Sequence, residues 1–226
     1  MTQQATEKTG LSRQARCNRL AMEFRDGWVV NLGFGMPTLC SNYDLSDRTV
    51  IFQSENGVIG YGPLAAEGDE DLHLNNASGQ YVTMLPGAAI TDQSDSFCLI
   101  RAGYIDVVVL GAYEVAENGD FANWKIAGRK GGGIGGAMDL AVGSRRVFIV
   151  MDHTTRDGRP RLLPRCSLPV TALGVVSLVS TNLGLFEATP AGFIVRGIAP
   201  GFTPDEVQAQ TAAKLIVPDH LKEVPT

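Results

Sequence analysis

The chain has 226 residues, of which 44% are apolar, enough to bury a sizeable core in one large domain or two small ones. Its 19 Lys and Arg residues against 24 Asp and Glu residues give a formal net charge of -5, which argues against nucleic acid and anionic membranes as partners. No apolar run approaches the roughly 18–20 residues of a membrane span. The polar N-terminal stretch also lacks the apolar segment of a secretory signal.

Cysteine and histidine are few and widely separated. The four cysteines stand singly and form no CxxC pair, and the three histidines form no HExxH pattern. These spacings argue against a zinc site and against a disulfide scaffold, and they are typical of a protein kept in a reducing compartment. We therefore expect a cytoplasmic protein with no bound metal.

Hydrophobic periodicity predicts a single α/β domain over residues 1–226. Apolar residues at three- and four-residue spacing from Leu11 to Phe24 predict an amphipathic helix that ends at Asp26-Gly27. Continuous apolar runs over 106–110 and 146–151 are typical of parallel strands covered on both faces. The other predicted elements, in chain order, are a strand over 28–32, a short helix over 38–43, strands over 49–53, 81–85, 175–180, 184–187 and 193–198, and a capped helix from Thr203 towards Ala213.

Glycine is unusually frequent and clustered. Twenty-six glycines gather beside apolar runs, which is typical of strand-to-loop corners in α/β enzymes. The cluster over 33–38 is similar to a GxGxxG dinucleotide loop, but Thr38 replaces the third glycine and Pro37 interrupts the pattern. Dinucleotide binding is therefore disfavoured.

A carboxylate at the end of a predicted strand is the strongest candidate for chemistry. Asn56-Gly57 is first of all a turn. Such a corner also holds Glu55 with its oxygens towards a cleft, where a carboxylate can act as a nucleophile and form a covalent acyl intermediate. That reaction needs backbone N–H donors for the developing oxyanion. The glycine loop over 131–137 is either their source or a loop without a catalytic role. A hydrogen-bonded or surface role is favoured for His153 over that of a catalytic base.

Four separated motifs occur in a fixed order along the chain, over residues 31–38, 53–57, 119–124 and 135–140, with shorter matches over 166–171 and 187–190. Together they resemble the family I coenzyme A transferases, specifically the B (β) subunit of the 3-oxoacid CoA-transferases. The similarity covers about residues 11–217, nearly the whole chain. It implies an open, mostly parallel α/β sheet with covering helices, shared with glucosamine-6-phosphate and ribose-5-phosphate isomerases.

The resemblance also implies a reaction. Glu55 would attack an acyl-CoA thioester and form a glutamyl-CoA thioester, with the backbone N–H of Gly136 as the oxyanion donor. Coenzyme A is then a substrate, and no cofactor is required. The further residues expected to bind substrate are Asn31, Gly33, Gly35, Asn56 and Gly135.

A partner and a substrate follow from the same resemblance. The chain is about half of a complete enzyme, so we expect an A (α) subunit as partner and an α2β2 assembly. Segments 110–113 and 147–153 are closer to 3-oxoadipate CoA-transferases than to acetoacetate enzymes, which favours succinyl-CoA and 3-oxoadipate over succinyl-CoA and acetoacetate as the substrates. An acyl-CoA hydrolase that uses the same glutamate, and a scaffold protein without catalysis, remain alternatives.

The chain departs from the family at one position near the expected site. Many relatives have Asn-Ala-Gly-Lys where this chain has residues 76–79 as Asn-Ala-Ser-Gly, so a lysine expected near the substrate is absent. Arg129 and Lys130 remain as candidate contacts for an anion, although a solvated surface role is favoured for both.

Overall fold

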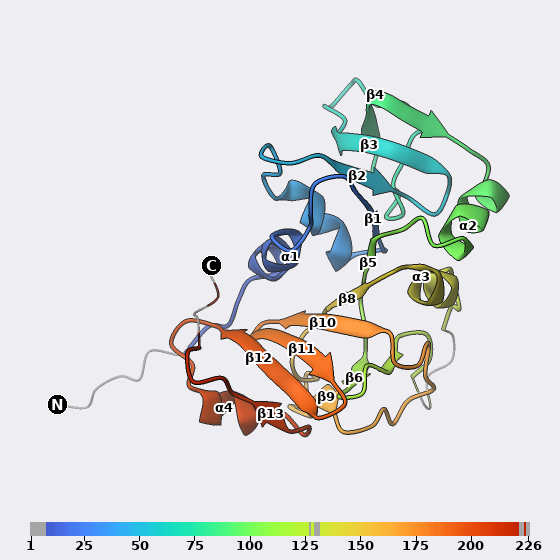
Figure 1. Ribbon diagram of the computed structural model, residues 1–226. Helices are drawn as coiled ribbons and strands as arrows, with labels where there is room; N and C mark the ends of the chain where they lie inside the picture. The colour runs from blue at the N-terminus through green and yellow to red at the C-terminus, as the bar shows by residue number, and fades with distance from the viewer. Residues whose placement is uncertain (1–7, 127, 129–131, 222–223, 225–226) are drawn as a thin grey trace.

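A ten-stranded mixed sheet organises the protein, whose computed structural model describes residues 8–126, 128, 132–221 and 224. The strand order is β13-β12-β11-β10-β8-β5-β1-β2-β3-β4. Its centre consists of five parallel strands, namely β10 (Val176–Thr181), β8 (Val147–Val150), β5 (Val107–Leu110), β1 (Trp28–Leu32) and β2 (Val50–Gln53). Figure 1 shows the sheet twisting from β4 to β12. The expected open, mostly parallel α/β sheet is confirmed.

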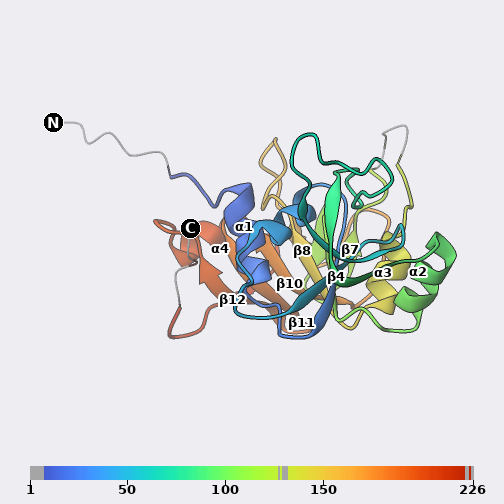
Figure 2. The same ribbon diagram turned by 90° about the horizontal axis from the view of Figure 1, so that it is seen from above.

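Antiparallel strands extend the sheet on both sides. On one side lie β3 (Val58–Leu64) and β4 (Val82–Ile90), and on the other lie β11 (Gly184–Thr189) and β12 (Gly192–Ile198), followed by β13 (Leu215–Ile216) parallel to β12. A separate three-stranded sheet contains β6 (Glu114–Ala116), β7 (Phe121–Ala122) and β9 (Leu162–Leu163). Figure 2 views the molecule from the β4 side, where β4 lies in front of the rest of the sheet.

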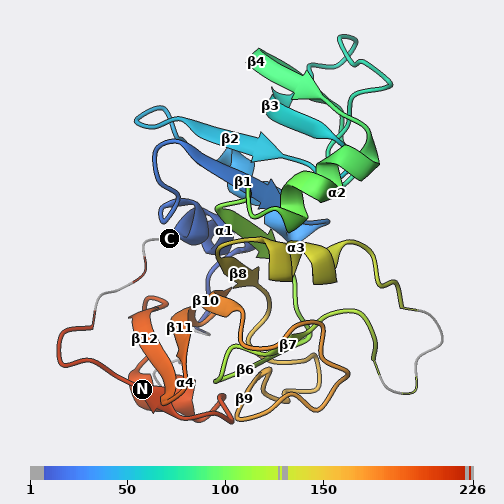
Figure 3. The same cartoon turned by 45° about the vertical axis from the view of Figure 1, so that its right-hand side comes forward.

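Helices cover the two faces of the central strands. The helix α1 (Arg13–Ala21) packs on one face, and α2 (Gln93–Arg101) and α3 (Ala137–Gly143) pack side by side on the other (Figure 3). Successive side chains of a strand point to opposite faces, so Val107 belongs to the core beside α1, whereas Val108 belongs to the core beside α2 and α3. This double coverage explains why β5 and β8 read as continuous apolar runs. A 3₁₀ helix, η1 (Met36–Asn42), and a short helix, α4 (Pro204–Gln208), complete the fold.

Several predicted boundaries were wrong. The first helix ends at Ala21, before the expected stop at Asp26-Gly27. The last ends at Gln208, short of Ala213, although its capping box between Thr203 and Glu206 is present. The strand expected to end before Pro86 continues to Ile90. Because β4 lies at the edge of the sheet, a proline without an N–H is tolerated there.

Other elements were not predicted at all. The unpredicted elements are the seven-residue strand β3, the short strands β6, β7, β9 and β13, and the helices α2 and α3. Among the described residues, no helix has the length and apolar character needed to cross a membrane.

Candidate active site

A cavity of about 490 Å³ lies where the central parallel strands end. Gly33 follows β1, Glu55 follows β2, Gly111 follows β5 and Asp152 follows β8, and all four line the cavity. The carboxyl ends of parallel strands meet at one edge of a sheet, which is where open α/β proteins bind ligands. The volume lies within the roughly 300–1,000 Å³ typical of small-molecule sites.

A tight turn between β2 and β3 holds Glu55. The N–H of Gly57 donates to the carbonyl of Ser54 at 2.9 Å, and the N–H of Ser54 donates to the carbonyl of Val58 at 2.8 Å. Thr91 donates its N–H to the carbonyl of Gly57 at 2.9 Å, and a Cβ at Gly57, whose φ is +111°, would overlap the Thr91 carbonyl oxygen. The turn is fixed on both sides, so the position of the Glu55 backbone is fixed as well.

The carboxylate of Glu55 is half-buried, and this burial raises its pKa above the ordinary value. Removal from water disfavours the charged form of an acid. The carboxylate lies directly against Gly136, because a Cβ there would overlap Glu55 Oε2 and lie 3.1 Å from Glu55 Cδ. It would also lie 2.9 Å from Cζ of Phe97 on α2. A side chain at position 136 would thus occupy the space that the carboxylate uses.

A glycine is required at position 136 because a side chain has no room there, and not because of the backbone conformation. Its φ of -88° and ψ of 0° are accessible to any residue. The residue is buried at the start of α3, and its carbonyl accepts from the N–H of Leu140 at 2.9 Å. Among the described residues, its own N–H donates no hydrogen bond to protein. That N–H is therefore available to an oxygen atom in the cavity.

A buried amide network connects the floor of the cavity to Glu55. Asn31, only 1% exposed, donates from Nδ2 to Gln53 Oε1 at 2.6 Å. Gln53 in turn donates from Nε2 to Ser96 Oγ at 2.8 Å and to the carbonyl of Ser54 at 3.0 Å. The network joins β1, β2 and α2 and ends at the residue before Glu55. Asn31 therefore contacts the cavity and also positions the Glu55 turn.

Five of the seven residues predicted from the sequence line this one cavity, namely Asn31, Gly33, Glu55, Gly135 and Gly136. Gly35 and Asn56 do not line it. The N–H of Gly35 donates to Ser78 Oγ at 2.9 Å, and Asn56 Nδ2 donates to the carbonyl of Asn75 at 2.9 Å. Both residues join loops beside the cavity. Ser78, which stands in the segment that departs from the family, thus has a hydrogen bond to the first glycine loop.

Further lining residues were not predicted from the sequence as site residues. Asp152 follows β8 just as Glu55 follows β2, so the same strand-end pattern could have identified it. Tyr113 and Arg161 also line the cavity, but they lie beside the short strands β6 and β9, for which the sequence gives no clear pattern. Arg129 and Lys130, considered above as anion contacts, lie outside the described residues, as does Gly131.

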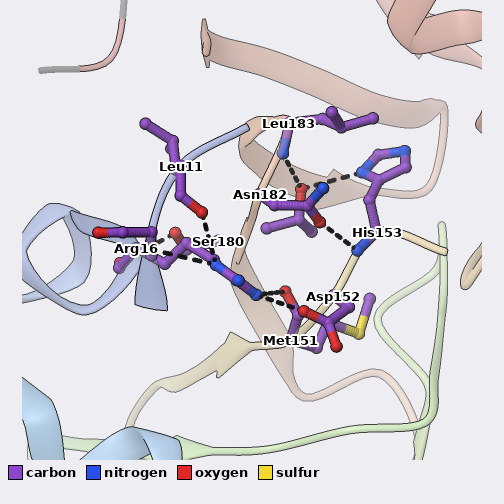
Figure 4. Close-up of polar contacts among 10 residues, drawn as sticks. Leu11, Arg16, Met151, Asp152, His153, Ser180, Asn182 and Leu183 are labelled. Atoms are coloured by element: carbon purple, nitrogen blue, oxygen red, sulfur yellow. Dashed lines mark hydrogen bonds and ion pairs between the residues drawn. The ribbon is translucent and has the colours of Figure 1, made fainter. Parts of the chain in front are cut away.

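Figure 4 shows the polar contacts at the end of β8, where Met151 and Asp152 line the cavity. Arg16 of α1 donates from Nη1 to Asp152 Oδ1 at 2.7 Å and to the carbonyl of Met151 at 3.1 Å. Arg16 is buried, and its Nε donates to the carbonyl of Leu11 at 3.2 Å. The carboxylate of Asp152 therefore already has a cationic partner.

His153 has the hydrogen-bonded structural role that was favoured for it. Its ring is fully buried, with Nδ1 at 2.9 Å from Thr181 Oγ1 and Nε2 at 2.8 Å from Thr211 Oγ1. Burial lowers its pKa to about 4. Among the described residues, no group of three or more His, Cys, Asp and Glu side chains could hold a metal ion.

Comparisons with known proteins agree with this arrangement. The chain is 45% identical to the B subunit of 3-oxoadipate CoA-transferase from Pseudomonas putida over 91% of this chain and 97% of the relative. It is 40% identical to the B subunit of succinyl-CoA:3-ketoacid coenzyme A transferase from Helicobacter pylori over 91% of this chain and 99% of the relative. The crystal structure of the acyl-CoA transferase YdiF from Escherichia coli O157:H7 has the same fold, with a TM-score of 0.75 and 20% identity over 97% of this chain and 44% of YdiF.

The profile of the family described as "Coenzyme A transferase" matches residues 15–210, most of the chain. The match includes β1, the Glu55 turn, Gly136 and the end of β8, which together surround the cavity. The chain therefore belongs to the coenzyme A transferase family.

Proposed function

We propose that this chain is the B subunit of a 3-oxoacid CoA-transferase that moves CoA from succinyl-CoA to a 3-oxo acid through a glutamyl-CoA thioester on Glu55. The observation that carries the proposal is the position of the Glu55 carboxylate, at the edge of the cavity and against Gly136. The turn fixes the backbone of Glu55, and its carboxylate is half-buried and not paired with a cation among the described residues. These are the properties of an activated carboxylate nucleophile.

The reaction begins with attack of a Glu55 oxygen on the thioester carbonyl carbon of the acyl-CoA. The C–S bond breaks, CoA leaves as a thiolate, and Glu55 carries an acyl-glutamyl anhydride. The thiolate then attacks the glutamyl carbonyl carbon, which releases the first acid and leaves CoA bound to Glu55 as a thioester. A second carboxylate repeats these steps in reverse order, takes the CoA, and restores the Glu55 carboxylate.

Each addition produces a negatively charged oxygen that needs a donor. The N–H of Gly136 is adjacent to the Glu55 carboxylate and, among the described residues, has no acceptor in the protein. A fixed N–H can donate its hydrogen bond to this oxygen as the negative charge develops. Such a bond stabilises the transition state more than the ground state. We assign Gly136 this role. Every step uses the carboxylate and the thiol, so the proposal includes no cofactor.

The acid that accepts CoA is proposed to be 3-oxoadipate, with acetoacetate as the second candidate. The Pseudomonas putida relative named for 3-oxoadipate is 45% identical, and the Helicobacter pylori relative named for a 3-ketoacid is 40% identical. Both relatives are B subunits by name, which supports an A subunit as partner, and we propose an α2β2 assembly. All four cysteines are free, which supports the proposed cytoplasmic location.

An exposed apolar surface on β3, β4 and the neighbouring loops is a suitable contact for that partner. The strand β4 lies at the sheet edge and is largely exposed along its length. The exposed large apolar residues of this region are Phe34, Leu64, Leu72, Tyr81, Met84, Leu85 and Ile90. A cluster of this kind marks a protein contact more often than a solvated surface.

The test is a matrix of acyl-CoA donors and acid acceptors with the chain co-expressed with its partner. Formation of the new acyl-CoA must exceed release of free CoA, since water that intercepts the anhydride leaves CoA as a free thiol and would make the protein a hydrolase. Glu55→Ala should abolish transfer while the complex still assembles. Transfer that survives in Glu55→Ala would rule out the glutamyl mechanism, and hydrolysis without transfer would favour the hydrolase.

A further inference from the structure

Within the described part of the chain, Arg161 is the one cationic residue that lines the cavity containing Glu55. Arg161 borders this cavity, together with Tyr113, and also borders an adjoining cavity of about 1140 Å³. Its backbone is fixed on both sides, since its N–H donates to the carbonyl of His153 at 3.0 Å and its carbonyl accepts from the N–H of Val115 at 3.0 Å. The Cα atom of Arg161 is therefore held in place between the end of β8 and β6.

The guanidinium of Arg161 has no acidic partner within the described part of the chain. Its Nε is buried and makes no hydrogen bond, and the residue takes part in none of the ion pairs found there. The acids nearby are already satisfied: Asp152 by Arg16 at 2.7 Å, and Glu114 by the N–H and hydroxyl of Ser167 at 2.7 and 2.6 Å. A buried donor of a charged group without an acceptor is unfavourable, so this guanidinium is suited to binding an anionic ligand.

The guanidinium and the nucleophile also lie apart from each other. Arg161 and Glu55 form no ion pair, and burial is the cause of the raised Glu55 pKa, with no opposing attraction from Arg161. A cation in contact with Glu55 would instead favour its charged form. Both residues line the same cavity of about 490 Å³, which can hold a small bound group that contacts both.

We propose that Arg161 binds the far carboxylate of a dicarboxylic acyl group whose other end reacts at Glu55. The planar guanidinium matches a carboxylate in a two-hydrogen-bond geometry. Succinyl and 3-oxoadipyl groups carry such a carboxylate, whereas an acetoacetyl group does not. The inference rests on the proposed function and gives it a substrate class: acids with a second carboxylate.

A phosphate group of CoA is the competing anion, because the adjoining cavity is also lined by Arg156, Arg159 and Arg165. The two anions make different predictions. A phosphate contact would affect every acyl-CoA equally, but a carboxylate contact affects only acyl groups that end in a carboxylate. We favour the carboxylate because Arg161, unlike those three arginines, lines the cavity of Glu55 itself.

The experiment compares, on the complex with its partner, two four-carbon acyl groups that differ at the far end. Glutamyl-CoA formation is measured from succinyl-CoA and from butyryl-CoA, in which a methyl group replaces the far carboxylate. Arg161→Gln should reduce kcat/KM for succinyl-CoA by roughly 10- to 100-fold, the range for loss of a charged hydrogen bond, and change that for butyryl-CoA less than about threefold. The kcat/KM of Arg161→Lys for succinyl-CoA should lie between those of the wild type and Arg161→Gln. Arg165→Gln is the control, because Arg165 is exposed and does not line the cavity of Glu55.

Equal losses with both donors would overturn the inference in favour of a CoA phosphate contact or a structural role. Unchanged kinetics in Arg161→Gln would overturn it as well. If Arg161→Gln does not assemble with the partner, Arg161→Lys is used instead. The deciding quantity is again the loss of kcat/KM for succinyl-CoA relative to the loss for butyryl-CoA. Calorimetric binding of succinate and butyrate separates this inference from the proposed function: if the wild-type complex forms no glutamyl-CoA but binds succinate through Arg161, only the proposed function fails.

Discussion

The carboxylate of Glu55 lies against the Cα atom of Gly136, where a Cβ would overlap Oε2 of the glutamate. The contact joins the turn after β2 to the start of α3, two segments far apart in the sequence. This contact explains why position 136 is a glycine, since the backbone conformation there is one that any residue can adopt. The same contact places next to the proposed nucleophile an N–H that has no acceptor among the described residues.

Gly136→Ala should reduce turnover far more than stability. The added methyl must displace the Glu55 carboxylate, which is the flexible end of a side chain, and approach Phe97 Cζ at 2.9 Å. Misplacement of a reacting group by about 1 Å costs about 100-fold in rate, so we expect a loss of that size in glutamyl-CoA formation, with a small change in Tm.

Gly133→Ala is the matched control, because Gly133 lines the same cavity and a Cβ there has no atom within 4 Å. Its turnover should stay close to that of the wild type. A Tm loss in Gly136→Ala that parallels the loss of turnover would instead indicate a glycine needed only for folding.

Glu55→Gln should stabilise the chain at neutral pH. Burial raises the pKa of Glu55 in the folded state above its ordinary value of 4.5, so the folded chain binds more protons than the unfolded chain between these two pKa values. Stability from this group is therefore present below pH 4.5 and is lost as the pH rises through the folded pKa. The gain in unfolding free energy should be present at pH 7.5 and shrink towards pH 4.

Denaturant titrations at the two pH values measure this effect. Glu67→Gln serves as the control, since Glu67 is exposed and lies outside the cavity. If Glu55→Gln were less stable than the wild type at pH 7.5, the carboxylate would be held by favourable contacts rather than strained by burial.

His153 should make the fold sensitive to mild acid. Its pKa is about 4 in the folded state against an ordinary 6.5, so the unfolded chain binds the proton more readily. Stability is therefore lost as the pH falls from 6.5 to 4, by about 3 kcal/mol at most, at about 1.4 kcal/mol for each pKa unit. Unfolding free energies at pH 7 and pH 4.5 should show a smaller loss in His153→Gln than in the wild type.

Exposed His73 provides the comparison for that measurement. His73→Gln should keep the wild-type loss between the two pH values. An identical loss in all three proteins would assign the acid sensitivity to other groups.

Gln53→Leu should lower both stability and turnover. The substitution leaves Asn31 Nδ2 without its acceptor and Ser96 Oγ without its donor. A buried polar group without a partner costs about 1–3 kcal/mol, and the Ser54 carbonyl before Glu55 loses its side-chain donor. We therefore expect a reduced unfolding free energy and, in the folded enzyme, a reduced kcat.

Gln208→Leu distinguishes the two effects. Gln208 also holds backbone atoms, with Nε2 at 3.1 Å from the Thr211 carbonyl, but it lies outside the cavity. It should lose stability and keep kcat. If Gln53→Leu and Gln208→Leu had the same kcat, the amide network would not be what positions Glu55.

The sequence is sufficient to predict the parts of the fold that local pattern determines. The strand β1 has the predicted bounds because its apolar run stands between Gly27 and Gly33. The Glu55 turn is predicted because Asn56-Gly57 follows the end of β2 after only Ser54 and Glu55. Both features depend on neighbouring residues alone.

Features that depend on distant contacts are not predictable in this way. The helix α2 has the sequence QSDSFCLIR, which buries only Ser96 and Ile100 and shows no clear apolar stripe, yet it brings Phe97 to Gly136. Arg161 reaches the cavity because the two-residue strand β9 pairs with β6. Pro86 indicates the end of a strand by local rules, but β4 continues through it because its edge position is a property of the whole sheet.

Mass spectrometry of the complex incubated with acyl-CoA alone tests the central claim most directly. We expect a CoA-sized mass on the peptide that contains Glu55, lost after borohydride treatment, absent in Glu55→Ala and slow to form in Gly136→Ala. A CoA adduct on another residue, or full CoA transfer by the wild-type complex without any adduct on Glu55, would contradict it.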